Sequence, residues 1–188
     1  LELTPITFNN ENAPTSPFLQ NEFIAKRDHQ RRMIELIVYN DCFYRNMYKY
    51  RYILIMDLDE IIMPLGSLMS YGELEKRFQN LQSKKCSQFP GYIFQNIYFS
   101  PKDNNAFQIP SFMPMSRKVV RKKFHSPPRY AVKSFLNTDL VLMVHNHVPI
   151  KWINNCDPTY VNVSDGQMQH YRKIEPETAV DDEVVDSN

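Results

Sequence analysis

The chain has 188 residues, of which 43% are apolar, so it is long enough for one domain with a buried core. Its net charge of +1 predicts no general attraction to nucleic acid or to a membrane surface, and no nucleic-acid partner is expected. The four glycines (Gly66, Gly72, Gly91 and Gly166) are too widely spaced for either a dinucleotide-binding or a P-loop phosphate motif.

The composition divides the chain into three parts. Residues 1–21 are rich in Asn and Pro and predict an irregular lead-in. Residues 22–174 are expected to form a single domain. Residues 175–188 carry six acidic residues between Glu175 and Asp186 and no basic one, which predicts a solvated, disordered tail.

A long helix is expected first, from about Glu22 to near Asn46. Apolar side chains recur there at helical spacing, namely Met33, Ile34, Ile37, Val38 and Cys42. Residues 52–56 then form a continuous apolar run (YILIM). Such a run predicts a strand buried on both faces, as in a parallel α/β sheet.

The later elements are predicted from shorter signals. Ser70 and Glu73 form a capping-box pattern, so a second helix is expected over residues 71–84. A strand is expected over residues 92–99, and strand or turn segments over 117–124 and 130–135. Another strand, over residues 140–144, runs into His145-Asn146-His147. Alternating helices and strands predict the α/β class.

Three carboxylates (Asp57, Asp59 and Glu60) follow directly after the first predicted strand. In open α/β sheets ligands bind outside the carboxyl ends of strands, and carboxylate oxygens at this spacing suit Mg²⁺ or Mn²⁺. A merely acidic, solvated loop is the alternative, but like charges this close repel unless a cation compensates them. Glu60 fits a structural ion pair with a basic residue equally well.

Two reaction classes place an Asp-x-Asp pair at such a position. In haloacid-dehalogenase-type phosphatases the first Asp, here Asp57, would be the nucleophile. That motif continues with Thr or Val, whereas Ile61 and Ile62 follow here. In nucleotide-sugar transfer on a GT-A fold, the pair holds a divalent cation against the diphosphate of the donor. That chemistry needs no glycine loop, in agreement with the glycine count.

Four segments together resemble glycosyltransferase family 92. They are residues 40–45 (NDCFYR), residues 52–64 (YILIMDLDEIIMP), Lys133-Ser134 with His145-Asn146-His147, and His170-Tyr171-Arg172. The resemblance covers roughly residues 20–175. It implies a partial GT-A fold, with a mixed sheet flanked by helices. The implied activity is hexosyl transfer, from UDP-galactose with Mn²⁺ or Mg²⁺ to a glycan acceptor.

The resemblance also carries expectations about location. Animal members of the family are type II membrane proteins of the Golgi, so a lumenal position in the secretory pathway is implied. In the family, a membrane anchor and the opening β-α units precede the conserved helix, and this chain is expected to begin after them. Membrane association is then expected only through a segment absent from the sequence. A truncated, inactive carbohydrate-binding remnant is a third hypothesis.

The resemblance implies a set of site residues. Asp57 and Asp59 are the expected metal ligands, joined by His170, with His147 as second choice and His145 as third. Lys133 and Arg172 are the expected donor-binding residues, through charge-assisted hydrogen bonds to the diphosphate, with a solvated surface role as the equal alternative for each. For a single histidine, a structural role is the more frequent alternative.

The catalytic base is not assigned. Inverting transfer requires a carboxylate near the acceptor hydroxyl. Between Glu75 and Glu175 the acidic residues are Asp103, Asp139, Asp157 and Asp165. All four remain candidates, because the sequence does not distinguish among them.

Overall fold

The computed structural model describes residues 27–81, 85–100, 120–172 and 183–185. Two helices lie in these ranges, α2 (Arg27–Asn46) and α3 (Tyr71–Asn80). The strands in chain order are β1 (Tyr52–Leu54), β2 (Glu60–Pro64), β3 (Gly91–Phe94), β4 (Asn96–Phe99), β5 (Val120–Lys122), β6 (Lys133–Asn137), β7 (Val141–Val144), β8 (Pro149–Trp152), β9 (Thr159–Tyr160), β10 (Gly166–Tyr171) and β11 (Glu183–Val185). None of the described helices is long and apolar enough to cross a bilayer.

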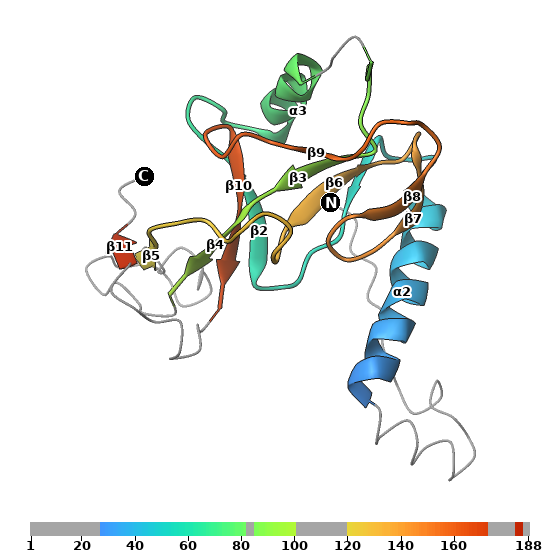
Figure 1. Ribbon diagram of the computed structural model, residues 1–188, viewed down its shortest axis with the longest axis horizontal. Coiled ribbons are helices and arrows are strands. Elements are labelled where there is room, and N and C mark those ends of the chain that lie inside the picture. Colours follow the sequence, from blue (N-terminus) through green and yellow to red (C-terminus); the bar gives the residue numbers. More distant parts are fainter. Residues whose placement is uncertain (1–26, 82–84, 101–119, 173–182, 186–188) are drawn as a thin grey trace.

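The strands form two mixed sheets and a hairpin. One sheet has the order β1-β6-β3-β9, the second has the order β11-β5-β4-β10-β2, and β7 pairs with β8. The β3–β9 and β4–β10 pairs are parallel, and the other pairs are antiparallel. Figure 1 shows α3 beside the central strands and α2 running past the β7–β8 hairpin. The predicted α/β class is confirmed, and the architecture is consistent with a partial nucleotide-sugar transferase fold.

Helix α2 is fastened to strand β7. The Asn40 side chain donates to the Val144 carbonyl at 3.0 Å and accepts from the Val144 amide at 3.0 Å. Tyr44 Oη donates to the Leu142 carbonyl at 2.6 Å. Phe43 is completely buried in the contact between α2 and β7. The side-chain amide of Asn40 thus forms with the backbone of β7 the same pair of hydrogen bonds that a residue of a neighbouring strand would form. Residues 22–26 of the predicted helix lie outside the described residues, but its predicted end at Asn46 is confirmed.

Strand β1 differs from its prediction. It is a three-residue edge strand that pairs antiparallel with β6, and not a strand of a parallel sheet. Tyr52 and Leu54 pack against one hydrophobic cluster, whereas Ile53 and Ile55 pack against another. Both faces are therefore covered. A continuous apolar run indicates that both faces of a strand are buried, but it does not indicate whether the neighbouring strand is parallel or antiparallel.

The second helix forms as the capping pattern predicts, although it ends at Asn80. The Glu73 amide donates to Ser70 Oγ at 3.3 Å, and the Glu73 carboxylate accepts from the Met69 amide at 2.6 Å. Residues 82–84 lie outside the described residues. Leu74 and Phe78 are buried, and the Phe78 ring stacks on Tyr92 of β3 with centroids 3.9 Å apart. Helix α3 is therefore held by the core of the first sheet.

The predicted strand over 92–99 is two strands in different sheets. Strand β3 belongs to the four-stranded sheet and β4 to the five-stranded sheet, with Gln95 between them. The Gln95 carbonyl accepts from the Met168 amide of β10 at 2.9 Å, so the crossing point itself is paired. The sequence could not show this break, because both strands are almost wholly buried and the apolar pattern runs through them.

The remaining segments agree in part. Strand β7 runs into His145-Asn146-His147 as predicted. Strand β5 lies within the segment predicted over 117–124, whereas β6 overlaps the segment predicted over 130–135 and continues to Asn137. The lead-in over 1–21 lies outside the described residues, as does most of the acidic tail. Residues Glu183–Val185 of that tail form β11 against β5, where the sequence predicted disorder.

A disulfide joins Cys86 to Cys156 across a sequence separation of 70 residues. It links the segment before β3 to the loop before β9, and the Asn154 side chain adds a hydrogen bond to the Gln88 carbonyl at 3.1 Å. Among the described cysteines, Cys42 is free. The sequence alone did not give this pairing. Disulfides form and persist in oxidising compartments.

We expect the double variant Cys86→Ala/Cys156→Ala to lose about 2–5 kcal/mol of unfolding free energy, because the bond restrains a long loop in the unfolded chain. Urea denaturation measures this loss. The matched control, Cys42→Ala, removes a thiol that forms no disulfide and should change stability much less. Equal stability of the double variant and the unaltered chain would show that the bond does not hold the fold.

Candidate active site

The acidic pair lies on a tight turn that joins β1 to β2. The Glu60 amide donates to the Asp57 carbonyl at 3.2 Å, and the Asp57 amide donates back to Glu60 Oε2 at 2.9 Å. Leu58 at the tip of the turn is almost fully exposed. The Glu60 carboxylate thus closes the turn from inside, while Asp57 and Asp59 keep about half of their side-chain surface in solvent.

Lys133 of β6 contacts this turn from the protein interior. Its side chain is completely buried, and Nζ lies 2.9 Å from Glu60 Oε2 and 3.6 Å from Asp57 Oδ2. Although the contact with Glu60 is a close ion pair, its angles fall outside hydrogen-bond geometry. A buried charge is tolerated only when it is paired, so Lys133 supplies the compensating cation that three adjacent carboxylates require.

His170 approaches the same turn from β10. Its Nε2 lies 3.3 Å from Asp59 Oδ2, and its Nδ1 lies 3.7 Å from Glu60 Oε1. The Tyr171 amide donates to the Asp59 carbonyl at 2.8 Å, which fixes the turn against the end of β10. Asp59 and His170 are 111 residues apart in the chain. The antiparallel pairing of β2 with β10, in which His170 faces Glu60, brings them together.

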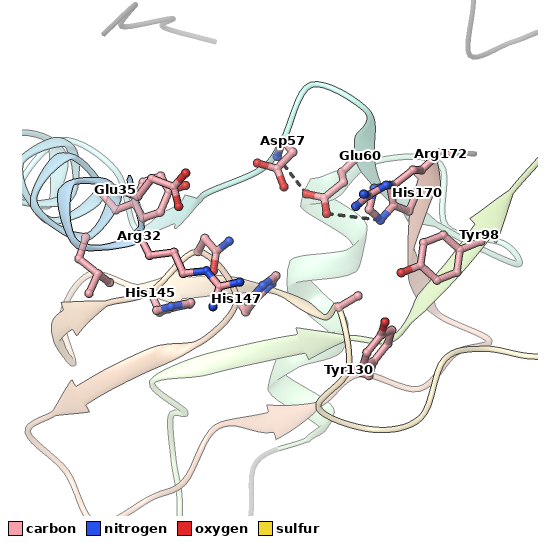
Figure 2. A pocket seen from close by; sticks show the side chains of 14 residues that line it. Arg32, Glu35, Asp57, Glu60, Tyr98, Tyr130, His145, His147, His170 and Arg172 are labelled. Atoms are coloured by element: carbon pink, nitrogen blue, oxygen red, sulfur yellow. Dashed lines mark hydrogen bonds and ion pairs between the residues drawn. The ribbon is translucent and has the colours of Figure 1, made fainter. Parts of the chain in front are cut away.

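A pocket of about 580 Å³ opens beside the turn. Figure 2 shows Asp57, Glu60, His170 and Arg172 along one side of it, with His145 and His147 across from them. Helix α2 contributes Arg32 and Glu35 to the lining, and Tyr98 and Tyr130 also line it. The lining is mainly polar and carries both signs of charge, which suits a ligand that is itself charged.

Buried polar atoms without a hydrogen-bond partner gather around this pocket. The described residues contain four such side-chain atoms. Two of them, His170 Nδ1 and Asn146 Oδ1, belong to residues that line the pocket, and a third, Lys133 Nζ, lies behind the turn in its ion pair with Glu60. Nearly all buried polar atoms in folded proteins find a partner in the protein or in water. Lys133 Nζ and His170 Nδ1 both face the Glu60 carboxylate, so Asn146 Oδ1 is the atom beside the pocket that is left for water or a ligand to contact.

The two histidines after β7 differ in their surroundings. His147 Nδ1 donates to the Val132 carbonyl at 2.8 Å, and this tautomer leaves Nε2 able to accept a proton or a metal. Burial, followed by the charges of His147 and Lys133, lowers the pKa of His145. His145 is therefore a neutral imidazole at neutral pH, which avoids a further positive charge beside Lys133.

Tyr98 stacks on the His170 ring, with centroids 5.1 Å apart, and burial raises the pKa of its hydroxyl. The hydroxyl therefore stays protonated at neutral pH. Arg129 and Ala131, on either side of Tyr130, have φ angles of 73° and 49°. Non-glycine residues enter this region at an energetic cost, and such conformations are frequent at functional sites.

The structure brings only some of the predicted metal ligands together. Asp59 and His170 are in contact, whereas Asp57 faces Lys133 and His147 lies across the pocket. Within the described ranges, no three His, Cys, Asp or Glu side chains are grouped tightly enough to form a ready cage for a metal ion. The metal-ligand set stays a prediction.

The predicted donor-binding residues lie in different environments. Arg172 is exposed at the end of β10 and lines the pocket. Lys133 is enclosed behind the turn, where it holds the carboxylates. A direct contact between Lys133 and a diphosphate remains a prediction.

The structure places the described candidate bases in different surroundings. Asp157 lines a second pocket that adjoins the first, as described below. Asp165 lies 3.9 Å from the Arg77 guanidinium on a turn before β10, and Asp139 lies on the turn between β6 and β7. Neither of these two lines a pocket that holds the histidines. Asp103 lies outside the described residues.

Sequence reasoning missed several residues of this pocket. Glu35 lies on the polar side of α2, and Tyr98 lies in a strand that reads as core. Tyr130 stands in a segment that gave no motif at all. The one available signal was the position of Glu35 opposite the apolar stripe, and it did not distinguish a pocket residue from an ordinary exposed one.

A comparison with protein families settles the family. The model of glycosyltransferase family 92 matches residues 1–188. The chain belongs to glycosyltransferase family 92. This membership supports glycosyltransferase activity in general, with a nucleotide-sugar donor and a glycan acceptor as the implied partners. No curated protein matches the chain in a sequence comparison.

We expect Lys133→Met to lower the unfolding free energy by about 3–5 kcal/mol, because it leaves the buried Glu60 without its cation. The double variant Lys133→Met/Glu60→Gln should recover part of this loss, since the uncompensated carboxylate is then removed. Chemical denaturation measures both.

An exposed ion pair provides the matched control. Arg45 and Asp41 lie 2.8 Å apart with more than half of each side chain in solvent. Arg45→Met should change stability by no more than about 0.5 kcal/mol. Comparable losses in the buried and exposed variants would refute the importance of the Lys133–Glu60 pair.

Proposed function

We propose that this member of family 92 transfers a hexose, namely galactose from UDP-galactose, to a hydroxyl group of a glycan acceptor. The observation that carries the proposal is the charged pocket beside the Asp57–Glu60 turn, where Asp59 and His170 lie in contact. Family membership supplies the reaction class, and the pocket supplies groups of the right chemistry for a nucleotide diphosphate.

The residues at the turn fit a divalent cation. Asp59 offers a half-exposed carboxylate, and His170 stands within contact distance of it with an imidazole. Carboxylate oxygen with imidazole is a donor set that Mn²⁺ accepts, and Mg²⁺ would use the oxygens alone. Asp59 and His170 would hold the ion, with Asp57 as the further carboxylate. When bound, the ion would neutralise charge on the diphosphate leaving group.

The remaining groups of the pocket would bind and orient the donor. Arg172 is exposed at the rim and can form charge-assisted hydrogen bonds to phosphate oxygens. Lys133 lies directly behind the turn, so it would act on the diphosphate through the carboxylates that it contacts. The protonated hydroxyl of Tyr98 would serve as a hydrogen-bond donor in the same pocket.

The bond rearrangement is a direct displacement. The acceptor hydroxyl oxygen forms a bond to C1 of the donor sugar, and the bond from C1 to the β-phosphate oxygen breaks with its electron pair on the nucleotide. The hydroxyl proton passes to a carboxylate base. Formation of a β-linked product from an α-linked donor requires this single inversion.

The phosphatase alternative has little support. Ile61 and Ile62 follow the acidic residues where the motif of that class continues with Thr or Val. Membership in family 92 points to sugar transfer instead. A carbohydrate-binding remnant without activity would need no cation, and the experiment below distinguishes it.

The disulfide supports a lumenal location. A bond between Cys86 and Cys156 persists in an oxidising compartment, and the secretory pathway provides one. We therefore propose the Golgi lumen, or another compartment of that pathway, as the place of action. Membrane attachment would then require a segment other than the described helices.

We expect UDP to bind in the presence of Mn²⁺, and Asp59→Ala to weaken this binding at least about tenfold, because a cation ligand is lost. Titration calorimetry with UDP, with and without Mn²⁺, measures the effect. His170→Ala should behave similarly.

Asp41→Ala is the matched control, because Asp41 is an exposed carboxylate on α2 paired with Arg45. It should bind UDP as the unaltered protein does. Binding of UDP that is equally tight without metal and in Asp59→Ala would sink the metal assignment, and failure of UDP to bind at all would sink the proposed function.

A further inference from the structure

A second pocket adjoins the candidate active site. Its volume is about 590 Å³, and it shares His145 and His147 with the first pocket. These two histidines follow β7, and their rings lie 5.6 Å apart. Because both side chains line both pockets, two molecules bound in the pockets would lie next to each other.

The lining of the second pocket differs from that of the first. Trp152 and Tyr160 supply aromatic surface, whereas Arg129 and Asp157 supply one charge of each sign. Pro149 and Pro158 add rigid apolar surface. A sugar ring has an apolar C–H face and a rim of hydroxyl groups, so aromatic surface combined with a few polar groups suits it better than a purely charged or purely apolar ligand.

The loop that carries Asp157 is anchored to the segment before β3. The disulfide fixes the neighbouring residue, Cys156, to Cys86, and Pro158 follows directly on the other side. The Asn154 side chain ties the same loop to the Gln88 carbonyl. A side chain carried by such an anchored loop has less conformational freedom to lose on binding, as a catalytic group requires.

The strained segment links the two pockets. Arg129 lines the second pocket, while Tyr130 and Ala131 line the first. The Arg129 amide donates to Tyr160 Oη at 2.9 Å, which orients this tyrosine along the pocket wall. The positive φ angles of Arg129 and Ala131 thus occur where one short segment serves both pockets.

We propose that the second pocket binds the acceptor sugar, and that Asp157 takes the proton from the attacking hydroxyl group. The proposal rests on the proposed function for the reaction itself. The acceptor oxygen bonds to C1 of the donor sugar, the bond from C1 to the diphosphate breaks with its electrons on the nucleotide, and the proton moves to the Asp157 carboxylate. Trp152 packs against the apolar face of the sugar.

The choice of Asp157 follows from placement. Of the three candidate carboxylates that the structure describes, it alone lines a pocket in contact with the active-site histidines. Asp165 is engaged with Arg77, and Asp139 stands on a separate turn. Both Asp157 and Asp139 are exposed, so the two differ in location and not in solvation.

Trp152 provides a direct probe, because it is the only tryptophan of the chain. We expect methyl β-galactoside or a related methyl glycoside to change the fluorescence of Trp152 on titration, in the presence of UDP and Mn²⁺. Trp152→Tyr, which preserves an aromatic surface, should retain transfer to the glycoside. Trp152→Ala should raise KM for the glycoside about tenfold or more.

Asp157→Asn tests the base. We expect it to lower kcat of transfer at least about a hundredfold, which is the usual contribution of a positioned general base. Calorimetric binding of UDP and the glycoside-induced change in Trp152 fluorescence should stay within about twofold of the unaltered protein, since a binding change of that size is under 0.5 kcal/mol. Asp139→Asn is the matched control and should retain full transfer.

The outcomes separate the two proposals. If UDP binds but no methyl glycoside changes the Trp152 signal, the acceptor pocket is refuted and the proposed function stands. The same holds if Asp157→Asn and Trp152→Ala transfer galactose normally. If UDP does not bind to the unaltered protein, the proposed function fails together with the role of Asp157 as a base, and a Trp152 signal with glycoside would then show a carbohydrate-binding site alone.

Discussion

The arrangement of the site depends on the buried ion pair between Lys133 and Glu60. Lys133 begins β6 of one sheet, and Glu60 begins β2 of the other, so the pair joins the two sheets at the point where the acidic turn forms. Glu60 also closes that turn through the Asp57 amide and faces His170 of β10. A buried pair gains little net free energy because both ions lose their hydration, but it fixes relative position. Here it aims Asp57 and Asp59 outward while the balancing charge stays inside.

The sequence predicted the local elements better than their neighbours. The cap at Ser70 and the end of α2 at Asn46 depend on nearby residues, and both formed as predicted. The antiparallel pairing of β1 and the division at Gln95 depend on which distant strand lies alongside. An apolar pattern indicates that a strand is buried, but it is the same whichever neighbouring strand buries it. The disulfide was hidden for a related reason, since three cysteines allow several pairings.

In the candidate site, too, contacts between distant residues were harder to predict than local features. Asp59 and His170 lie in contact, although 111 residues separate them and no local pattern connects them. The complete burial of Lys133 could not be read from the sequence, because lysine is normally exposed and its partner depends on the sheet register. Tyr98 was missed because a strand residue facing a pocket has the same sequence signature as one facing the core. Asp157 was among the candidates, but only the placement of its loop distinguished it.

The β7–β8 hairpin carries both histidines that the pockets share, and the Asn40 amide of α2 holds that hairpin by two hydrogen bonds. Any shift of the hairpin would therefore change the candidate active-site pocket and the neighbouring pocket together. Two ligands that contact the same hairpin would then be coupled thermodynamically, since each favours the hairpin position that suits it. The order in which such an enzyme admits its substrates would then be a property of this hairpin and of the helix that restrains it.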